Sequence, residues 1–234
     1  MAQASSSLNT NFCIYLCGES TYLHCKSRIS DCTPIKDLSK IMTEDEILSE
    51  FRAAEALLEG HFLLSSGRHS AYYLQCARLL MNPERASRVA VAIAQKLPRD
   101  IRSQIDIVVS PAMGGIIIGH EMGRALGVDA LFVERPEGVF GLRRGFALKE
   151  GQKVLMVEDV VTTGLSSREA IKAIENAGGE VIAAASIVDR SAGAVELGVP
   201  FFPLIELNFP TYAPDELPAE LAATEAVKPG SRKA

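Results

Sequence analysis

The stretch VLMVEDVVTTGLSS, residues 154–167, is the most informative part of the sequence for the fold. Four apolar residues open it, and two carboxylates, Glu158 and Asp159, follow where a buried strand is expected to end. Two valines then lead into a Thr-Thr-Gly loop, residues 162–164, and a helix is expected from about Ser166. A strand, a short loop and a helix in this order are the repeating unit of an α/β protein.

The loop of this stretch has the chemistry of a phosphate site. Threonine hydroxyls, backbone N–H groups and the positive end of a helix dipole attract phosphate, and Gly164 allows the close approach of backbone to ligand. Glu158 and Asp159 would repel a bare phosphate, so they favour a ligand that also carries hydroxyls or a metal ion. A phosphorylated ribose meets both needs. The alternative is a purely structural turn with a helix cap.

The rest of the chain alternates between short apolar runs and amphipathic segments. Ligands in open α/β sheets bind at the carboxyl ends of the strands, where the stretch above ends. Continuous apolar strands are typical of a parallel sheet that is covered by helices on both faces. We therefore predict an α/β fold with a mainly parallel sheet, with strands at 105–109, 130–133, 154–157 and 181–188 and helices at 83–97, 116–126 and 166–177.

The folded domain is expected to span residues 42–234. Thr43 and Glu46 form a capping-box pattern before the first helical periodicity. Residues 1–41 show no periodicity, and we expect a disordered N-terminal extension there. Four of the five cysteines lie in this extension: Cys13, Cys17, Cys25 and Cys32. They are either incidental thiols or ligands of a zinc ion. Their spacing does not form two tight pairs, which favours incidental thiols.

Composition excludes several classes of protein. The chain has 234 residues, of which 47% are hydrophobic, which suffices for the core of one domain. A formal net charge of -5 argues against a nucleic-acid partner. No apolar run reaches the roughly 18–20 residues that cross a bilayer, and no secretory signal is recognisable. We expect a soluble, cytoplasmic protein.

Residues 154–166 resemble the motif by which type I phosphoribosyltransferases bind 5-phosphoribosyl 1-pyrophosphate (PRPP). The resemblance implies that Glu158 and Asp159 hold the ribose hydroxyls and that residues 162–166 bind the 5′-phosphate. It also implies the fold of that family, with a small hood subdomain beside the sheet. Leu165 is unusual at its position. The implied PRPP-binding residues are Glu158, Asp159, Val160, Val161, Thr162, Thr163, Gly164, Leu165 and Ser166.

Three further segments resemble the orotate phosphoribosyltransferases within that family. They are the early signature FLLSSGRHSAYY at 62–73, the loop SPAMGG at 110–115 and VDR at 188–190; the tail from 210 to 232 is also similar to one bacterial branch. By resemblance, Thr162 and Arg190 contact orotate. The implied pyrophosphate loop consists of Ala112, Met113, Gly114 and Gly115.

The chain also departs from the better-known branch of these enzymes. Ser65 and Gly114 stand where that branch has lysines. The loop over the active site, residues 134–145, carries arginines instead of lysines and a histidine. Arginine can neutralise phosphate, although a solvated hairpin face would also explain Arg143 and Arg144. The residues expected to carry catalysis are Asp159, Glu158 and Arg135.

The implied reaction transfers the 5-phosphoribosyl group from PRPP to orotate, giving orotidine 5′-phosphate and pyrophosphate in pyrimidine biosynthesis. Mg²⁺ is the implied cofactor, held by oxygens of the ligand and not by protein alone. The implied assembly is a homodimer, with no nucleic-acid or membrane partner. Two alternatives stay open: a purine-base phosphoribosyltransferase and a non-catalytic regulator that senses PRPP.

Overall fold

The computed structural model describes residues 42–64 and 66–229, and all of them belong to one compact unit. The four N-terminal cysteines, Ser65, Arg232 and the expected extension of residues 1–41 lie outside the described residues. The expected start of the domain therefore remains a prediction. Thr43 does form the capping box: its backbone N–H donates to Glu46 Oε2 at 2.9 Å, and Glu46 N–H donates to Thr43 Oγ1 at 3.3 Å.

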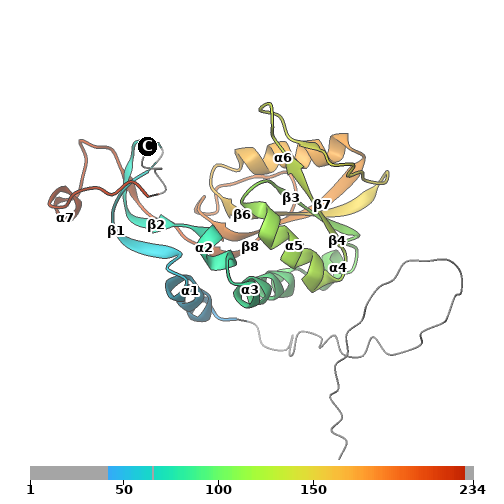
Figure 1. Ribbon diagram of the computed structural model, residues 1–234, viewed down its shortest axis with the longest axis horizontal. Helices are drawn as coiled ribbons and strands as arrows, with labels where there is room; N and C mark the ends of the chain where they lie inside the picture. Colours follow the sequence, from blue (N-terminus) through green and yellow to red (C-terminus); the bar gives the residue numbers. More distant parts are fainter. Residues whose placement is uncertain (1–41, 65, 230–234) are drawn as a thin grey trace, which may run out of the picture. The chain divides into compact units, whose positions relative to one another are not determined.

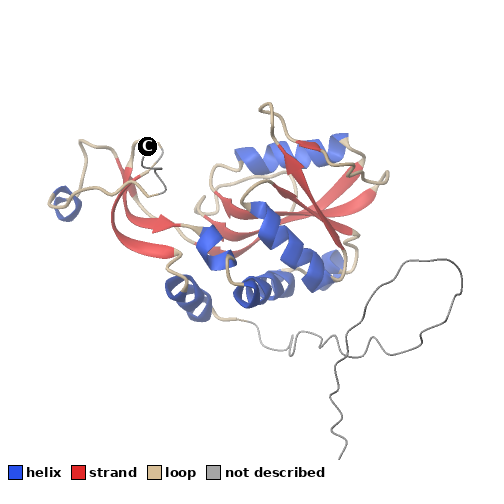
Figure 2. Ribbon diagram, viewed as in Figure 1, coloured by secondary structure: helices blue, strands red, loops and turns tan. Residues whose placement is uncertain are grey.

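Helices and strands alternate along the described chain (Figures 1 and 2). None of the described helices combines the length and apolar character that a membrane span requires. In chain order the elements are α1 Glu44–Ala53, β1 Leu57–Leu63, β2 His69–Leu74, α2 Cys76–Leu80, α3 Pro83–Lys96, α4 Arg99–Arg102, β3 Ile107–Pro111, α5 Gly115–Leu126, β4 Asp129–Glu134, β5 Gly141–Leu142, β6 Gln152–Val161, α6 Leu165–Asn176, β7 Gly179–Asp189, β8 Phe201–Glu206, β9 Thr211–Tyr212 and α7 Ala219–Ala222.

The larger sheet has the strand order β5-β4-β3-β6-β7-β8, and only the β4–β5 pair is antiparallel. Alternation along β6 sends Leu155 and Val157 into a core with α3 and α5, and sends Val154 and Met156 into a core with α6. Figure 1 shows α6 on one face of the sheet and α3 and α5 on the other. The predicted mainly parallel α/β fold is confirmed.

The smaller sheet has the order β1-β2-β9 and is antiparallel, and it corresponds to the expected hood. The C-terminal segment returns to it, since Val227 N–H donates to His61 O at 2.8 Å and its carbonyl accepts from Leu63 N–H at 2.9 Å. His69 lies on β2, and its Nδ1 is 2.6 Å from His61 Nε2.

One predicted strand is longer than expected. The apolar run predicted a strand at 154–157, but β6 continues through both carboxylates to Val161. The reason is pairing: Val160 and Val161 lie opposite Val188 and Asp189 of β7. Glu158 and Asp159 are therefore held on a rigid strand and not on a loop.

The order of the strands fixes where a ligand site can form. From β3 the chain passes to β4 on one side, and it later returns to β6 on the other side of β3. The loops that follow β3 and β6 therefore open at a topological switch point, the place where open α/β sheets bind ligands.

Candidate active site

Glu158 and Asp159 lie at the carboxyl end of β6 and point to opposite faces of the sheet. On the α6 side, Ser167 Oγ donates to Glu158 Oε2 at 3.2 Å. Asp159 turns toward the loop after β3, and its Oδ1 accepts from Val160 N–H at 2.9 Å. Each carboxylate thus faces a different loop of the switch point.

Both carboxylates resist ionisation. Burial, and secondarily the charge of Asp159, raise the pKa of Glu158 to about 8, although Ser167 and Arg135 partly oppose the shift. Burial also raises the pKa of Asp159 above its ordinary value, opposed by backbone N–H groups. Half-buried carboxylates with few donors are suited to accept hydrogen bonds from a ligand that brings hydroxyls.

The loop between β3 and α5 packs directly against Asp159. A Cβ added at Gly114 would lie 2.5 Å from Asp159 Oδ2, so only glycine leaves room for the carboxylate in this position. A Cβ at Gly115 would lie 3.1 Å from Val157 O, which shows how closely the start of α5 approaches β6. The four residues of the predicted pyrophosphate loop lie here, with Met113 exposed.

The Thr-Thr-Gly loop follows β6 and leads into α6, which begins at Leu165, one residue before the expected start. Gly164 has φ = 72°, and a Cβ there would overlap Val195 and Leu197 of the loop after β7. Thr162, Thr163 and Ser166 are exposed on this loop. The predicted phosphate loop is therefore an open turn at a helix N-terminus whose backbone only glycine can adopt.

Arg190 follows β7 at the same edge, where its backbone N–H donates to Val161 O at 2.8 Å. Asp189 fixes the turn after it, because its Oδ1 accepts from Ser191 N–H at 2.7 Å. The Arg190 Nε is buried and has no hydrogen-bond partner, and burial lowers the pKa of the guanidinium. A buried donor without an acceptor is costly, so an anionic acceptor placed beside this guanidinium would stabilise it.

Arg135 leaves the end of β4 and lies against α6 of the same chain. Its Nη2 is 2.6 Å from Glu169 Oε2 and 3.4 Å from Ser166 Oγ, and its Cζ lies 4.1 Å from the centre of the Phe140 ring. Glu169 Oε2 is buried and accepts no well-aligned hydrogen bond, so the contact is an ion pair rather than a directed bond. Arg135 therefore places a cation beside the phosphate loop.

The other two arginines of the loop are placed differently. Arg144 forms a two-point ion pair with Glu134, with Nη2 to Oε1 at 2.8 Å and Nε to Oε2 at 2.9 Å, and lies over the ring of Phe132. Arg143 is exposed. β5 pairs with the end of β4, so the segment is a hairpin. This arrangement agrees with the solvated hairpin face that was one explanation of Arg143 and Arg144.

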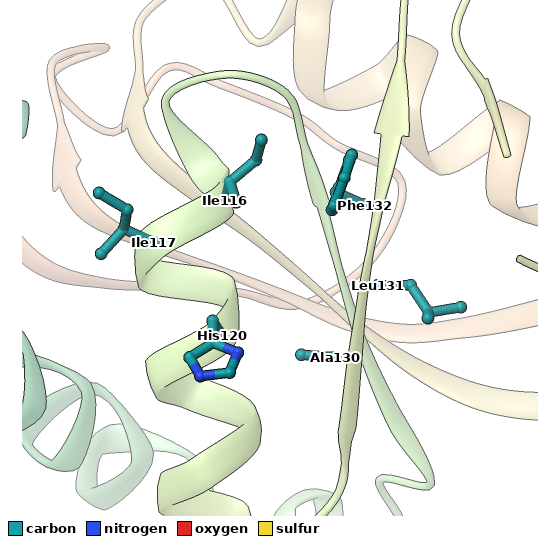
Figure 3. A pocket seen from close by; sticks show the side chains of 6 residues that line it. All are labelled: Ile116, Ile117, His120, Ala130, Leu131 and Phe132. Carbon is teal, nitrogen blue, oxygen red and sulfur yellow. The ribbon is translucent and has the colours of Figure 1, made fainter. Parts of the chain in front are cut away.

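A separate groove lies between α5 and β4. Figure 3 shows the side chains that line it, which are apolar except for one exposed histidine: Ile116, Ile117, His120, Ala130, Leu131 and Phe132. The groove contains none of the predicted site residues. It adjoins the pyrophosphate loop through Ile116, whose N–H donates to Met113 O at 3.2 Å.

The structure thus brings the predicted site residues to the ends of neighbouring strands. Gly114 approaches Asp159, Arg190 is bonded to Val161, and Arg135 reaches Ser166. Glu169, Ser167 and Phe209 also contact this group and were not foreseen, because helical and strand periodicity says nothing about contacts between distant segments.

Several known proteins resemble this chain in sequence and in fold. Residues 76–198 match the phosphoribosyl transferase domain family. The orotate phosphoribosyltransferase of Novosphingobium aromaticivorans is 83% identical over 191 residues, which cover 82% of this chain and 98% of that protein. That of Caulobacter vibrioides is 56% identical over 192 residues, with coverages of 82% and 98%. The crystal structure of orotate phosphoribosyltransferase from Aeropyrum pernix has a TM-score of 0.57 and 28% identity, over 69% of this chain and 93% of the other.

Proposed function

This chain belongs to the phosphoribosyltransferase family, among its orotate phosphoribosyltransferases, and we propose that it transfers the 5-phosphoribosyl group of PRPP to orotate. The products are orotidine 5′-phosphate and pyrophosphate. One observation carries the assignment of the site: the loops after β3 and β6 meet at the switch point, with Asp159 against Gly114. This juxtaposition provides one loop for each end of PRPP and two carboxylates between them.

We propose the following roles for the site residues, and this placement supports them. Residues 162–166 bind the 5′-phosphate, Glu158 and Asp159 accept from the ribose hydroxyls, and residues 112–115 hold the pyrophosphate. Arg190, with Thr162 beside it, takes the carboxylate of orotate, which supplies the acceptor that the buried Nε lacks. Arg135 stabilises charge that develops on the phosphate groups.

We also propose that Mg²⁺ is the cofactor of this reaction. Among the described residues, no three His, Cys, Asp or Glu side chains form a metal-binding group. Mg²⁺ is usually held by one or two carboxylates together with phosphates of the substrate, and Asp159 beside the pyrophosphate loop fits that pattern. The ion would neutralise the pyrophosphate as it leaves.

A homodimer in the cytoplasm is the proposed assembly. Exposed apolar side chains on and before α5 support it, because Met113 is 83% and Ile117 is 45% exposed beside the groove of Figure 3. Light scattering should give a mass near twice the 25.2 kDa of one chain, and Ile117→Glu should reduce it.

A panel of acceptor bases tests the proposed substrate. Pyrophosphate release from PRPP is measured with orotate, adenine, guanine and hypoxanthine, with and without Mg²⁺. The proposal requires orotate to be the preferred base and Mg²⁺ to be needed. Preference for a purine would show that the base is wrongly assigned, and PRPP binding without turnover would favour the regulator.

A further inference from the structure

Three side chains from distant parts of the chain form a stack beside the proposed base site. Tyr72 of β2 and Phe209, which follows β8, have ring centres 4.6 Å apart and ring planes 22° apart. Arg190 also lies over the Phe209 ring, and its Cζ is 5.7 Å from the ring centre. The stack therefore joins the small sheet to the arginine at the end of β7.

The backbone on both sides of Phe209 is held firmly. Before it, Leu207 N–H donates to Asp189 O at 2.8 Å, next to Arg190. After it, Pro210 O accepts from Ser70 Oγ at 3.3 Å, and β9 begins to pair with β2. Phe209 thus lies where the chain crosses from the large sheet to the small one, and its ring has little freedom to move.

Arg190 needs a support of this kind. Its Nε is buried without an acceptor, and no carboxylate of the described residues is paired with its guanidinium. The distance of 5.7 Å from Arg190 Cζ to the centre of the Phe209 ring is within the range of a cation–π interaction. An aromatic ring supplies contacts with the flat face of the guanidinium together with a favourable electrostatic attraction.

We propose that Phe209 is a positioning residue for orotate: it holds the Arg190 guanidinium in place to receive the carboxylate of the base, with Tyr72 supporting the ring from behind. This inference rests on the proposed function, and in particular on Arg190 as the partner of that carboxylate. It adds a residue that none of the recognised sequence segments contains.

The position of Phe209 predicts an effect on one substrate only. Phe209→Ala should raise the KM for orotate about two- to fivefold, the range of an exposed cation–π contact. The KM for PRPP should stay unchanged, since the aromatic and cation–π partners of the ring among the described residues are Tyr72 and Arg190, outside the loops after β3 and β6. Phe209→Tyr and Phe209→Trp keep the ring and should restore the KM for orotate.

A matched control separates positioning from packing. Phe202 of β8 is also partly buried against the same core but has no contact with Arg190, so Phe202→Ala should lower the melting temperature without changing either KM. If Phe209→Ala does not fold, Phe209→Leu takes its place. Arg190→Ala supplies the second test, because Phe209→Ala should have no further effect on the KM for orotate in that background.

The outcomes are distinct. Equal changes in both KM values, no rescue by tyrosine or tryptophan, or additive effects with Arg190→Ala would show that Phe209 only packs the core. These results would overturn the inference while the wild-type protein still releases pyrophosphate with orotate. Absence of orotate-dependent release by the wild-type protein would instead contradict the proposed function.

Discussion

Glu158 and Asp159 are adjacent in the sequence, yet β6 directs them to opposite faces of one sheet edge. Their burial gives this edge an energetic consequence. A carboxylate that is held away from water without a full set of donors destabilises the protein until a ligand supplies hydrogen bonds. The acidic pair therefore lowers the folding stability of the free protein, and hydrogen bonds from ribose hydroxyls would reduce this loss.

The raised pKa of Glu158 predicts how stability depends on pH. The folded protein keeps this carboxyl protonated up to about pH 8, whereas the unfolded chain loses the proton near 4.5. The folded state binds more protons between these values, so wild-type stability should fall as the pH rises through this window. Each unit of pKa shift corresponds to about 1.4 kcal/mol.

Glu158→Gln removes this dependence. The variant should melt at about the wild-type temperature near pH 4.5 and several degrees above it near pH 8.5, since about 1 kcal/mol shifts Tm by about 2–4 °C in a chain of this size. Thermal melts across that range measure the difference. Glu175→Gln, an exposed change on α6, serves as the control. A constant difference between Glu158→Gln and wild type at all pH values would contradict the assigned pKa.

Arg135→Ala should lower turnover more than it weakens orotate binding. Pyrophosphate gains charge as it leaves, so a cation near the phosphates helps the transition state more than the ground state. Steady-state kinetics with Arg143→Ala as the control measure the effect, because Arg143 is an exposed arginine of the same loop. Unchanged kcat in Arg135→Ala would remove this residue from the catalytic group.

For individual residues, the sequence predicted which residue types form the site but not which residues they contact. The types and order of side chains in 154–166 pointed to the phosphate loop and the acidic pair before any fold was known. The partner of Arg135 could not be foreseen, because Glu169 is one of many charged residues on helices. Phe209 gave no signal, since an isolated aromatic residue usually packs in a core.

At the scale of elements, the turn between β6 and α6 depends on a single glycine. Gly164→Ala should destabilise the protein by about 1–2 kcal/mol or more, because an L side chain is strained at φ = 72° and its Cβ would overlap Val195. It should also raise the KM for PRPP by distorting the phosphate loop. Gly141→Ala is the matched control, since its Cβ would meet nothing and its φ is not in the left-handed region. Equal stability of the two variants would show that the turn tolerates a side chain.

Periodicity predicted most elements of the large sheet, because buried parallel strands read as apolar runs. Periodicity failed where the pairing of strands determines where a strand begins or ends. The carboxylates did not end β6, since β7 continues to pair beyond them, and β8 was not predicted. The two residues of β9 are too few to show any pattern.

At the scale of the whole molecule, the strand order creates the site. No local pattern tells on which side of β3 the strand β6 will lie, so the switch point could be seen only in the fold. The family resemblance predicted the switch point indirectly, because it implied the fold of the family. Hydrophobic periodicity alone would have predicted an α/β sheet but not the position of the site.

Removal of residues 1–41 tests the proposed extent of the domain. The capping box at Thr43 satisfies the first backbone N–H groups of α1, so the shortened protein should keep its melting temperature and activity. Thermal melts and kinetics of both forms measure the outcome. A large loss of either property would place part of the folded domain before residue 42.

The central claim is that the edge where β3, β6 and β7 end binds PRPP and transfers its ribosyl group to orotate. Orotate-dependent release of pyrophosphate from PRPP, compared between the wild-type protein and Asp159→Asn, tests it most directly. The wild-type protein should release pyrophosphate only with orotate and Mg²⁺, and Asp159→Asn should fold normally but lose about ten- to a hundredfold in kcat/KM for PRPP, the range of a charged hydrogen bond. Release that does not depend on orotate, or an unchanged kcat/KM in Asp159→Asn, would contradict the account.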